Sequence, residues 1–417
     1  MELLSQPSNG SRIEYLDILR GIAILFIFIA NIMAFSGFLY ATEIKGIVPI
    51  ELPTDLILDF TLFILVDGKF YSIFSLLFGI GFAIQLHNQE KAGKPFVPFF
   101  RRRMSWLLII GLIHLIFIWF GDILTLYAIC GFILILFRNH SNRSLLIWAS
   151  ILLILPIIHT FLLGQHGFNY PEYFYDLNAH YWERNNLPLI IWYNGEPTAD
   201  LGLYVTTHSF SEYVTITLGN WLLRIGAILE EGRIFKVFGI FLIGVWAGRN
   251  IIYKDLLNNL ILLRKILIWS LILGLPASAL KTYIEFFQWG NESWNLIKQI
   301  AYLIGTVPLA LSYASAIALL LKRKIVFLHW FQPVGKMALS NYLMQSIIGI
   351  TIFYGVGLGL AGKLGFTLIL LTAISIFIFQ ALISKWWLSR FQYGPAEWVW
   401  RRLSYGKNFN SLKPNKQ

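Results

Sequence analysis

The chain has 417 residues, of which 57% are hydrophobic, 16% are aromatic and only 13% are charged. A soluble domain carries roughly 25% charged residues, so this composition excludes an ordinary cytosolic enzyme, a secreted disulfide scaffold and a disordered chain. The sequence therefore predicts an all-α, polytopic integral membrane protein. We assign its net charge of +11 to contacts with a lipid bilayer and not with nucleic acid.

Ten apolar segments are predicted to cross the bilayer as helices, which takes about 20 residues each. They are residues 18–39, 69–86, 104–120, 123–137, 145–163, 234–248, 266–280, 300–321, 337–354 and 364–384. A further stretch, residues 55–66, is too short and too acidic to span, and we expect an interfacial or re-entrant helix there. The first span lacks a small-residue cleavage site, so it is expected to be an anchor.

The loops between these segments differ in charge. If the N-terminus is cytoplasmic, one side of the membrane holds 24 of the 33 Lys and Arg residues and only 6 of the 22 acidic residues. Cytoplasmic loops attract Lys and Arg. Both termini are therefore expected in the cytoplasm, with the protein in the cell membrane (plasma or inner) as a multi-pass protein.

Three regions follow in chain order. Residues 1–163 form an N-terminal transmembrane bundle, and residues 234–417 form a C-terminal transmembrane domain with a basic cytoplasmic tail. Between them lies a long outer loop, residues 164–233, within which residues 209–229 are predicted to form an amphipathic helix at the membrane surface. Loops of this length are usually functional or structured. The single cysteine, Cys130, excludes a disulfide within the chain and is expected to be buried and inert.

Polar residues in the first span are early candidates for function, because an ionisable group costs at least about 2.5–3.5 kcal/mol to insert. Asp17 and Arg20 stand three residues apart on one helix face, where they can pair. Such a pair either fixes the helix end at the headgroups or belongs to a site. Asn31 lies further along the same span.

Three further residues are candidates for catalysis. Asp59 shares one face of the short helix with Asp55, and the two carboxylates either bind a cation or an amine, act as an acid and a base, or form a solvated face. His114 lies near the middle of the third span, where a neutral imidazole either acts as a base or proton relay or joins two helices by a hydrogen bond. Asp122 opens the next helix, where it either caps the first turn or helps to activate an acceptor.

Basic residues gather on the cytoplasmic side. Most such residues only hold the topology against anionic lipid heads, but arginine forks also suit the phosphate oxygens of a donor such as acyl-CoA. In the ninth span, Asn341 and Gln345 form a polar stripe that is expected to face protein or a water-filled cavity. The residues assigned to substrate or donor binding are Asp17, Arg20, Asn31, Arg101, Arg102, Arg103, Lys336, Asn341, Gln345, Glu397 and Arg401.

Several familiar motifs are missing from the sequence. It contains no Walker loop, dinucleotide fingerprint, zinc-binding spacing or nucleophile elbow. The eight histidines are scattered, so no metal site is predicted. Acyl-CoA is the one cofactor-like molecule that the basic clusters suggest.

Five motifs in a fixed order carry a resemblance to a known family. They lie in residues 12–31, with Leu19-Arg20-Gly21 at their centre, and in residues 74–79, 101–124, 335–342 and 394–398. In these motifs the chain resembles the YeiB-like family of bacterial multi-pass membrane proteins. The C-terminal half of that family is a domain of unknown function, family 418.

That family is similar in turn to a wider group of transmembrane acyltransferases, so the resemblance implies acyl transfer across the membrane. In those proteins a donor binds from the cytoplasm and the acceptor lies on the far side. Many of them carry a catalytic histidine about eleven residues after the arginine that matches Arg20, where this chain has Asn31. Others place a histidine in the next outer loop, but residues 40–68 contain none. Acyl transfer would therefore use His114 or a carboxylate such as Asp59 as its base.

Three functions are compatible with these features. The first is an acyltransferase-like protein that passes an acyl group from a cytoplasmic donor to an outer acceptor. The second is a transporter or exporter of a small amphipathic or cationic compound, with proton coupling at His114. The third is a non-catalytic structural or sensing membrane protein. A homodimer through apolar faces is compatible with all three.

Overall fold

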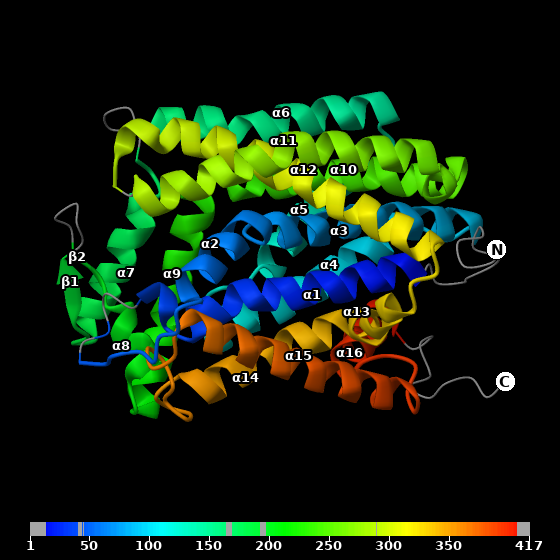
Figure 1. The fold of residues 1–417 in the computed structure, drawn as a ribbon. Coiled ribbons are helices and arrows are strands. Elements are labelled where there is room, and N and C mark those ends of the chain that lie inside the picture. The colour runs from blue at the N-terminus through cyan, green and yellow to red at the C-terminus, as the bar shows by residue number, and fades with distance from the viewer. Residues whose placement is uncertain are drawn as a thin grey trace.

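The computed structural model describes residues 14–40, 44, 46–163, 169–191, 197–288 and 290–406. These residues form a bundle of long helices with roughly aligned axes (Figure 1). The helices of the first half are α1 (Glu14–Phe35), η1 (Phe38–Tyr40), α2 (Asp55–Leu65), α3 (Lys69–Lys91), α4 (Phe96–Ile113), the π-helix η2 (His114–Ile118), α5 (Leu124–Leu134), η3 (Ile135–Phe137), α6 (Asn142–Leu163), α7 (Glu172–Arg184), α8 (Leu201–Thr206) and α9 (Phe210–Glu230). The second half holds α10 (Arg233–Lys254), η4 (Leu256–Asn258), α11 (Leu260–Phe287), η5 (Glu292–Trp294), α12 (Asn295–Lys322), η6 (Val326–Phe331), α13 (Gln332–Lys336), α14 (Ala338–Phe353), α15 (Phe366–Leu388) and α16 (Pro395–Tyr405).

In the described part of the chain, the β-sheet consists of two short strands. Strands β1 (Leu189–Ile191) and β2 (Pro197–Ala199) pair antiparallel, with Leu189 opposite Ala199. The hairpin lies with α7, α8 and α9 at one end of the bundle (Figure 1). The predicted helical class is therefore confirmed.

Each of the ten predicted spans coincides with a helix. Within the described residues, seven stretches are long and apolar enough to cross a membrane, and the shorter apolar helices Leu124–Phe137 and Ala338–Phe353 add to them. α4 is not among these because its first half carries three consecutive arginines. The stretch predicted as a short separate helix, residues 55–66, is α2, which a turn with a left-handed Gly68 (φ 77°) joins to α3.

Apolar side chains cover the outside of several helices as well as the core. On α6, Ile147, Ile151, Ile154 and Ile158 are all exposed and recur at helical spacing, so they form one continuous apolar face. The exposed side of α11 is similar, and the side chain of Trp269 there is 64% exposed. Such faces are those of a membrane protein, whose surroundings are apolar.

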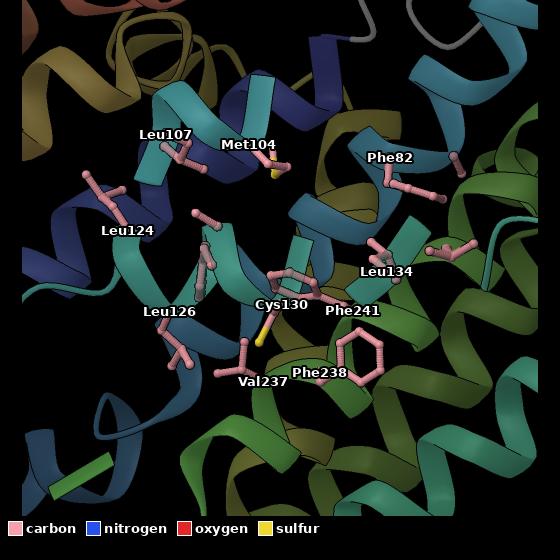
Figure 2. Close-up of a cluster of buried hydrophobic side chains, with 14 of the residues drawn as sticks. Phe82, Met104, Leu107, Leu124, Leu126, Cys130, Leu134, Val237, Phe238 and Phe241 are labelled. Carbon is pink, nitrogen blue, oxygen red and sulfur yellow. The ribbon is translucent and has the colours of Figure 1, made fainter. Parts of the chain in front are cut away.

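The interior is divided into apolar clusters, of which one lies between α3, α4, α5 and α10 (Figure 2). Cys130 sits inside this cluster and is fully buried, as predicted. α3 and α10 approach closely at Gly79 and Gly244. A Cβ at Gly79 would lie 2.1 Å from the carbonyl oxygen of Phe241, so only glycine allows this approach.

The two ends of the bundle differ in charge, as the sequence predicts. The ends of α3 and α12, the starts of α1 and α4, and α16 lie together at one end (Figure 1). We call this end the basic face, because it carries Arg101, Arg102, Arg103, Lys322, Arg323 and Lys324. α7, α8 and α9 lie at the opposite face.

α9 coincides to within one residue at each end with the predicted amphipathic helix of residues 209–229. Its N-cap is Ser209, whose Oγ accepts a hydrogen bond from the Glu212 amide. Its end enters the bundle. A Cβ at Gly232, just after α9, would lie 3.2 Å from Cβ of Pro156 on α6. Pro156 is seven residues, or roughly 10 Å, from the end of α6. The turn between α9 and α10 therefore lies well below the opposite face, and the side chain of Arg233 beside it is only 17% exposed.

Candidate functional site

A buried group of three side chains joins α14 to the turn after α4. His114 Nδ1 lies 3.0 Å from Asp122 Oδ1, and His114 Nε2 lies 2.9 Å from Ser346 Oγ. All three residues are at most 1% exposed. We call this group the His114 triad.

Local structure places His114 and Asp122 together. α4 changes at His114 into the π-helix η2, in which the Trp119 amide donates to the His114 carbonyl oxygen over 2.8 Å. π-helical turns are rare and frequent at functional sites. The chain then turns back within a few residues, and Asp122 Oδ2 accepts from the Thr125 amide over 2.7 Å at the start of α5. Asp122 thus caps the first turn of α5, which is one of the two roles that the sequence left open, and it also pairs with His114, which was not predicted.

The arrangement could activate a hydroxyl. In the tautomer whose Nδ1 hydrogen donates to Asp122, Nε2 is left as the acceptor for the Ser346 hydroxyl. A base oriented by a carboxylate and bonded to a hydroxyl is the pattern of nucleophilic catalysis. Ser346 was not predicted, because it lies 232 residues from His114 in the chain.

A cavity of about 1260 Å³ lies beside the triad. Along α3 its wall runs from Gly68 to Lys91, roughly 34 Å at 1.5 Å per residue. Along α1 it runs from Leu16 to Asn31. Because the hydrocarbon core of a bilayer is about 30 Å thick, the cavity follows most of the path across the membrane.

The cavity lining is strongly basic. Its basic residues are Arg20, Lys91, Arg103, Arg224, Arg233, Lys336 and Arg401, and Glu397 is the acidic residue among the lining residues of the described chain. Most of the basic residues lie toward the basic face, whereas Arg224 lies in the second half of α9 and Arg233 is the first residue of α10. Such a lining suits an anionic ligand.

Two arginines at the basic end of the cavity are held against aromatic rings. The Arg103 guanidinium lies 3.7 Å from the ring centre of Trp400, and the Trp400 indole donates to the Arg103 carbonyl oxygen over 2.9 Å. Arg401 lies 4.5 Å from the ring centre of Tyr393. These contacts fix the guanidinium groups. Their neighbours Arg101 and Arg102 are exposed and do not line the cavity.

Glu397 ties α16 to the start of α14. Its carboxylate accepts from the Leu339 amide over 2.6 Å and from the Ser340 amide and hydroxyl over 3.2 and 2.5 Å. Burial raises the pKa of Glu397 above its usual range, although the hydrogen bonds from Ser340 and Leu339 act in the opposite direction. The acid is thus a structural anchor in the wall of the cavity.

The part of the cavity wall farthest from the basic face carries cations that the sequence predicts on the outer side of the membrane. Arg224 donates from Nε to the Asp122 carbonyl oxygen over 3.0 Å, and Arg233 forms two hydrogen bonds with Glu231 over 2.6 and 2.7 Å. Behind them Lys236 is 1% exposed, and its Nζ lies 3.5 Å from the ring centre of Tyr302. Arg224 and Arg233 fall in the predicted outer loop, residues 164–233, which concealed their place in the cavity wall, whereas Lys236 falls in the predicted span 234–248.

The cavity and the triad are neighbours. Gly121, Ile123 and Tyr342 line the cavity, and the rings of Tyr342 and His114 are 5.2 Å apart. The triad therefore lies directly behind this part of the cavity wall.

The predicted site residues fall into two groups. The structure places six of them on the cavity wall: Arg20, Asn31, Arg103, Lys336, Glu397 and Arg401. Asp17 is buried beside the cavity, where it accepts from Arg20 over 3.0 Å, so the predicted ion pair is confirmed. Asp59, on α2, and Arg101 and Arg102 lie away from the cavity.

Asn341 and Gln345 also lie outside the cavity. Asn341 donates to Ser384 Oγ over 3.0 Å and Gln345 donates to Gln380 Oε1 over 2.9 Å. Both are 2% exposed, so the predicted stripe faces protein, and it joins α14 to α15. Among the described residues there is no group of three or more His, Cys, Asp or Glu side chains that could hold a metal ion.

Comparisons with known proteins agree in placing the chain among uncharacterized bacterial proteins. Residues 247–407 match the family model described as a protein of unknown function, DUF418. Over 411 residues, 97% of each chain, the protein is 30% identical to the uncharacterized protein YxaH of Bacillus subtilis (strain 168). It is 27% identical to the uncharacterized protein YeiB of Escherichia coli (strain K12) over 410 residues, which cover 93% of this chain and 95% of YeiB. No solved structure matches the chain.

Proposed function

The chain belongs to the YeiB-like family of DUF418 membrane proteins, and from that premise we propose that it is a transmembrane acyltransferase. It takes an acyl group from a phosphate-bearing thioester donor, such as acyl-CoA, at the basic face. It passes the group to a hydroxyl or amine acceptor that enters from the opposite face. In this proposal the basic face is cytoplasmic and the membrane is the bacterial cell membrane.

The observation that carries the proposal is the basic cavity that ends beside the His114 triad. Arg103, Lys336 and Arg401 lie at its basic end, where guanidinium and ammonium groups suit the phosphates of a donor. The apolar length of the cavity along α3 suits the extended arm that carries the thioester. His114 lies next to the far part of the wall, where a base is needed to accept the proton of the acceptor.

Donor binding by the purified protein in detergent tests the proposal, and the arginine triplet supplies matched variants. Arg103→Gln removes a guanidinium from the cavity wall, whereas Arg101→Gln removes one from the exposed side of the same helix. A hydrogen bond to a charged group contributes about 1.5–3 kcal/mol. We therefore expect Arg103→Gln to weaken the binding of acetyl-CoA by about tenfold or more, and Arg101→Gln to leave it unchanged. Equal effects of the two variants would contradict the proposal.

A transporter is the second candidate, because the cavity follows most of the length of α3. The basic lining then favours an anionic cargo over a cationic one. Uptake of such a cargo by proteoliposomes, with no acyl product from any donor, would favour transport. Consumption of acetyl-CoA that depends on His114 would favour the acyltransferase.

A further inference from the structure

We propose that Ser346 is the nucleophile of this acyltransferase and carries the acyl group as a covalent ester between donor and acceptor. The inference rests on the proposed function and adds to it a two-step reaction and an acyl-enzyme. The alternative is direct transfer, in which His114 only removes a proton from the acceptor.

The direction of the Ser346 hydroxyl is the first argument. Serine and threonine hydroxyls within helices usually bond to the carbonyl oxygen four residues earlier. Thr351, on the same helix, does so with Ile347 over 2.8 Å, and Ser375 does so with Leu371 over 2.8 Å. Ser346 instead forms its hydrogen bond with His114 Nε2. Its hydroxyl is thus paired with a base, as a nucleophile requires.

The second argument is the presence of Asp122. A buried carboxylate is costly unless it is paired, and a carbonyl oxygen would suffice to orient a neutral imidazole. A carboxylate in addition stabilises the imidazolium that forms when His114 takes up the proton of Ser346. Asp122 is 1% exposed and points Oδ1 at Nδ1 of His114 over 3.0 Å.

The third argument is the position of Ser346 on α14. Ala338 and Tyr342 both line the cavity, and Ser346 follows Tyr342 by four residues. Residues four apart share one face of a helix. Ser346 therefore lies on the same face of α14 as the cavity wall, one turn beyond Tyr342 and about 6 Å further along the helix axis, although it does not itself line the cavity.

The reaction balances in two steps. In the first, Ser346 Oγ forms a bond to the thioester carbonyl carbon and the carbon–sulfur bond breaks, while the Ser346 proton passes through His114 Nε2 to the leaving thiolate. In the second, the acceptor oxygen or nitrogen bonds to the acyl carbon and the serine ester bond breaks. The proton of the acceptor returns through His114 to Ser346. Nothing is oxidised or reduced.

Covalent labelling of the full chain in detergent tests this inference. Wild-type protein is incubated with radiolabelled acetyl-CoA, denatured, digested and analysed by mass spectrometry. We expect one acetyl group on the peptide that contains Ser346, and none in Ser346→Ala. The matched control is Ser312→Ala, since Ser312 is also 1% exposed but donates to the Leu267 carbonyl oxygen. Ser346→Cys should carry the acetyl group as a thioester that neutral hydroxylamine cleaves.

Failure of the inference is distinct from failure of the proposed function. If Ser346→Ala remains folded, binds acetyl-CoA and transfers its acetyl group at the wild-type rate, direct transfer holds and the nucleophile is refuted. If wild-type protein neither binds nor consumes acetyl-CoA, the proposed function fails for that donor. A fluorophosphonate probe then tests Ser346 alone. Labelling of Ser346 that is lost in His114→Ala supports the nucleophile, and no labelling overturns it.

Discussion

Two polar stripes run side by side along α14 and differ in what they bind. Asn341 and Gln345 meet the neutral side chains of Ser384 and Gln380 on α15. One residue further on, Tyr342 faces the cavity and Ser346 meets the ionisable pair of His114 and Asp122. Both stripes are polar and buried, so polarity alone does not separate a joint between helices from a reactive site. The hydrogen-bond partner separates them, because only the second stripe meets ionisable groups that can move a proton.

The largest effect that tests this difference is expected at His114. His114→Ala removes the base, and loss of a general base typically lowers a rate by about 10²- to 10⁴-fold. We expect that loss in the consumption of acetyl-CoA. His159→Ala is the matched control, because His159 is also a mostly buried histidine within a helix, bonded to Tyr170 over 2.6 Å. A comparable loss of rate in both variants would show that the difference between the stripes has no bearing on activity.

The next effect is expected in stability and not in activity. Gln345→Leu removes the donor to the buried Oε1 of Gln380, and leaving that acceptor unpaired costs about 1–3 kcal/mol. Thermal unfolding in detergent should occur at a lower temperature, with unchanged affinity for acetyl-CoA. The double variant with Gln380→Leu removes both amides and should recover part of the loss. If Gln345→Leu impaired acetyl-CoA binding more than stability, the first stripe would belong to the site.

The smallest effect is a pH dependence at Glu397, which binds the start of α14, the helix that carries both stripes. The pKa of Glu397 is raised by burial, so the folded protein favours the protonated acid. Its contribution to stability is full below the ordinary value of 4.5 and is lost as the pH rises through the raised pKa. Glu397→Gln stays neutral. The unfolding temperature of wild type should therefore fall relative to Glu397→Gln as the pH increases, and a constant difference would argue against the raised pKa.

The sequence predicts the helices well because a span needs a continuous apolar length, which is a local property. It also predicts the Asp17–Arg20 pair, since three-residue spacing fixes one helix face. The DUF418 match, residues 247–407, lies within the predicted C-terminal domain, 234–417. Ser346 escapes prediction because its partner is 232 residues away. The one available hint is that Tyr342 and Ser346 repeat the four-residue spacing of Asn341 and Gln345.

The basic residues of the cavity wall far from the basic face were not predicted, for a different reason. Arg224 and Arg233 fall in a long polar loop, which sequence rules place in water. In the structure, the turn after α9 packs against Pro156 inside the bundle. A loop that returns into the bundle brings its charges into the interior, and only tertiary packing reveals this.

The π-helix η2 has a consequence for how the protein tolerates insertions and deletions. One residue more in a helical turn rotates everything after it by about 100° relative to an unbroken α-helix. That rotation precedes the fold-back in which Asp122, only eight residues after His114, reaches the same imidazole. Deleting one residue from Leu115–Ile118 would restore a regular and locally more favourable helix, yet turn the carboxylate away. In η2, a more regular secondary structure would thus remove the contact between Asp122 and His114.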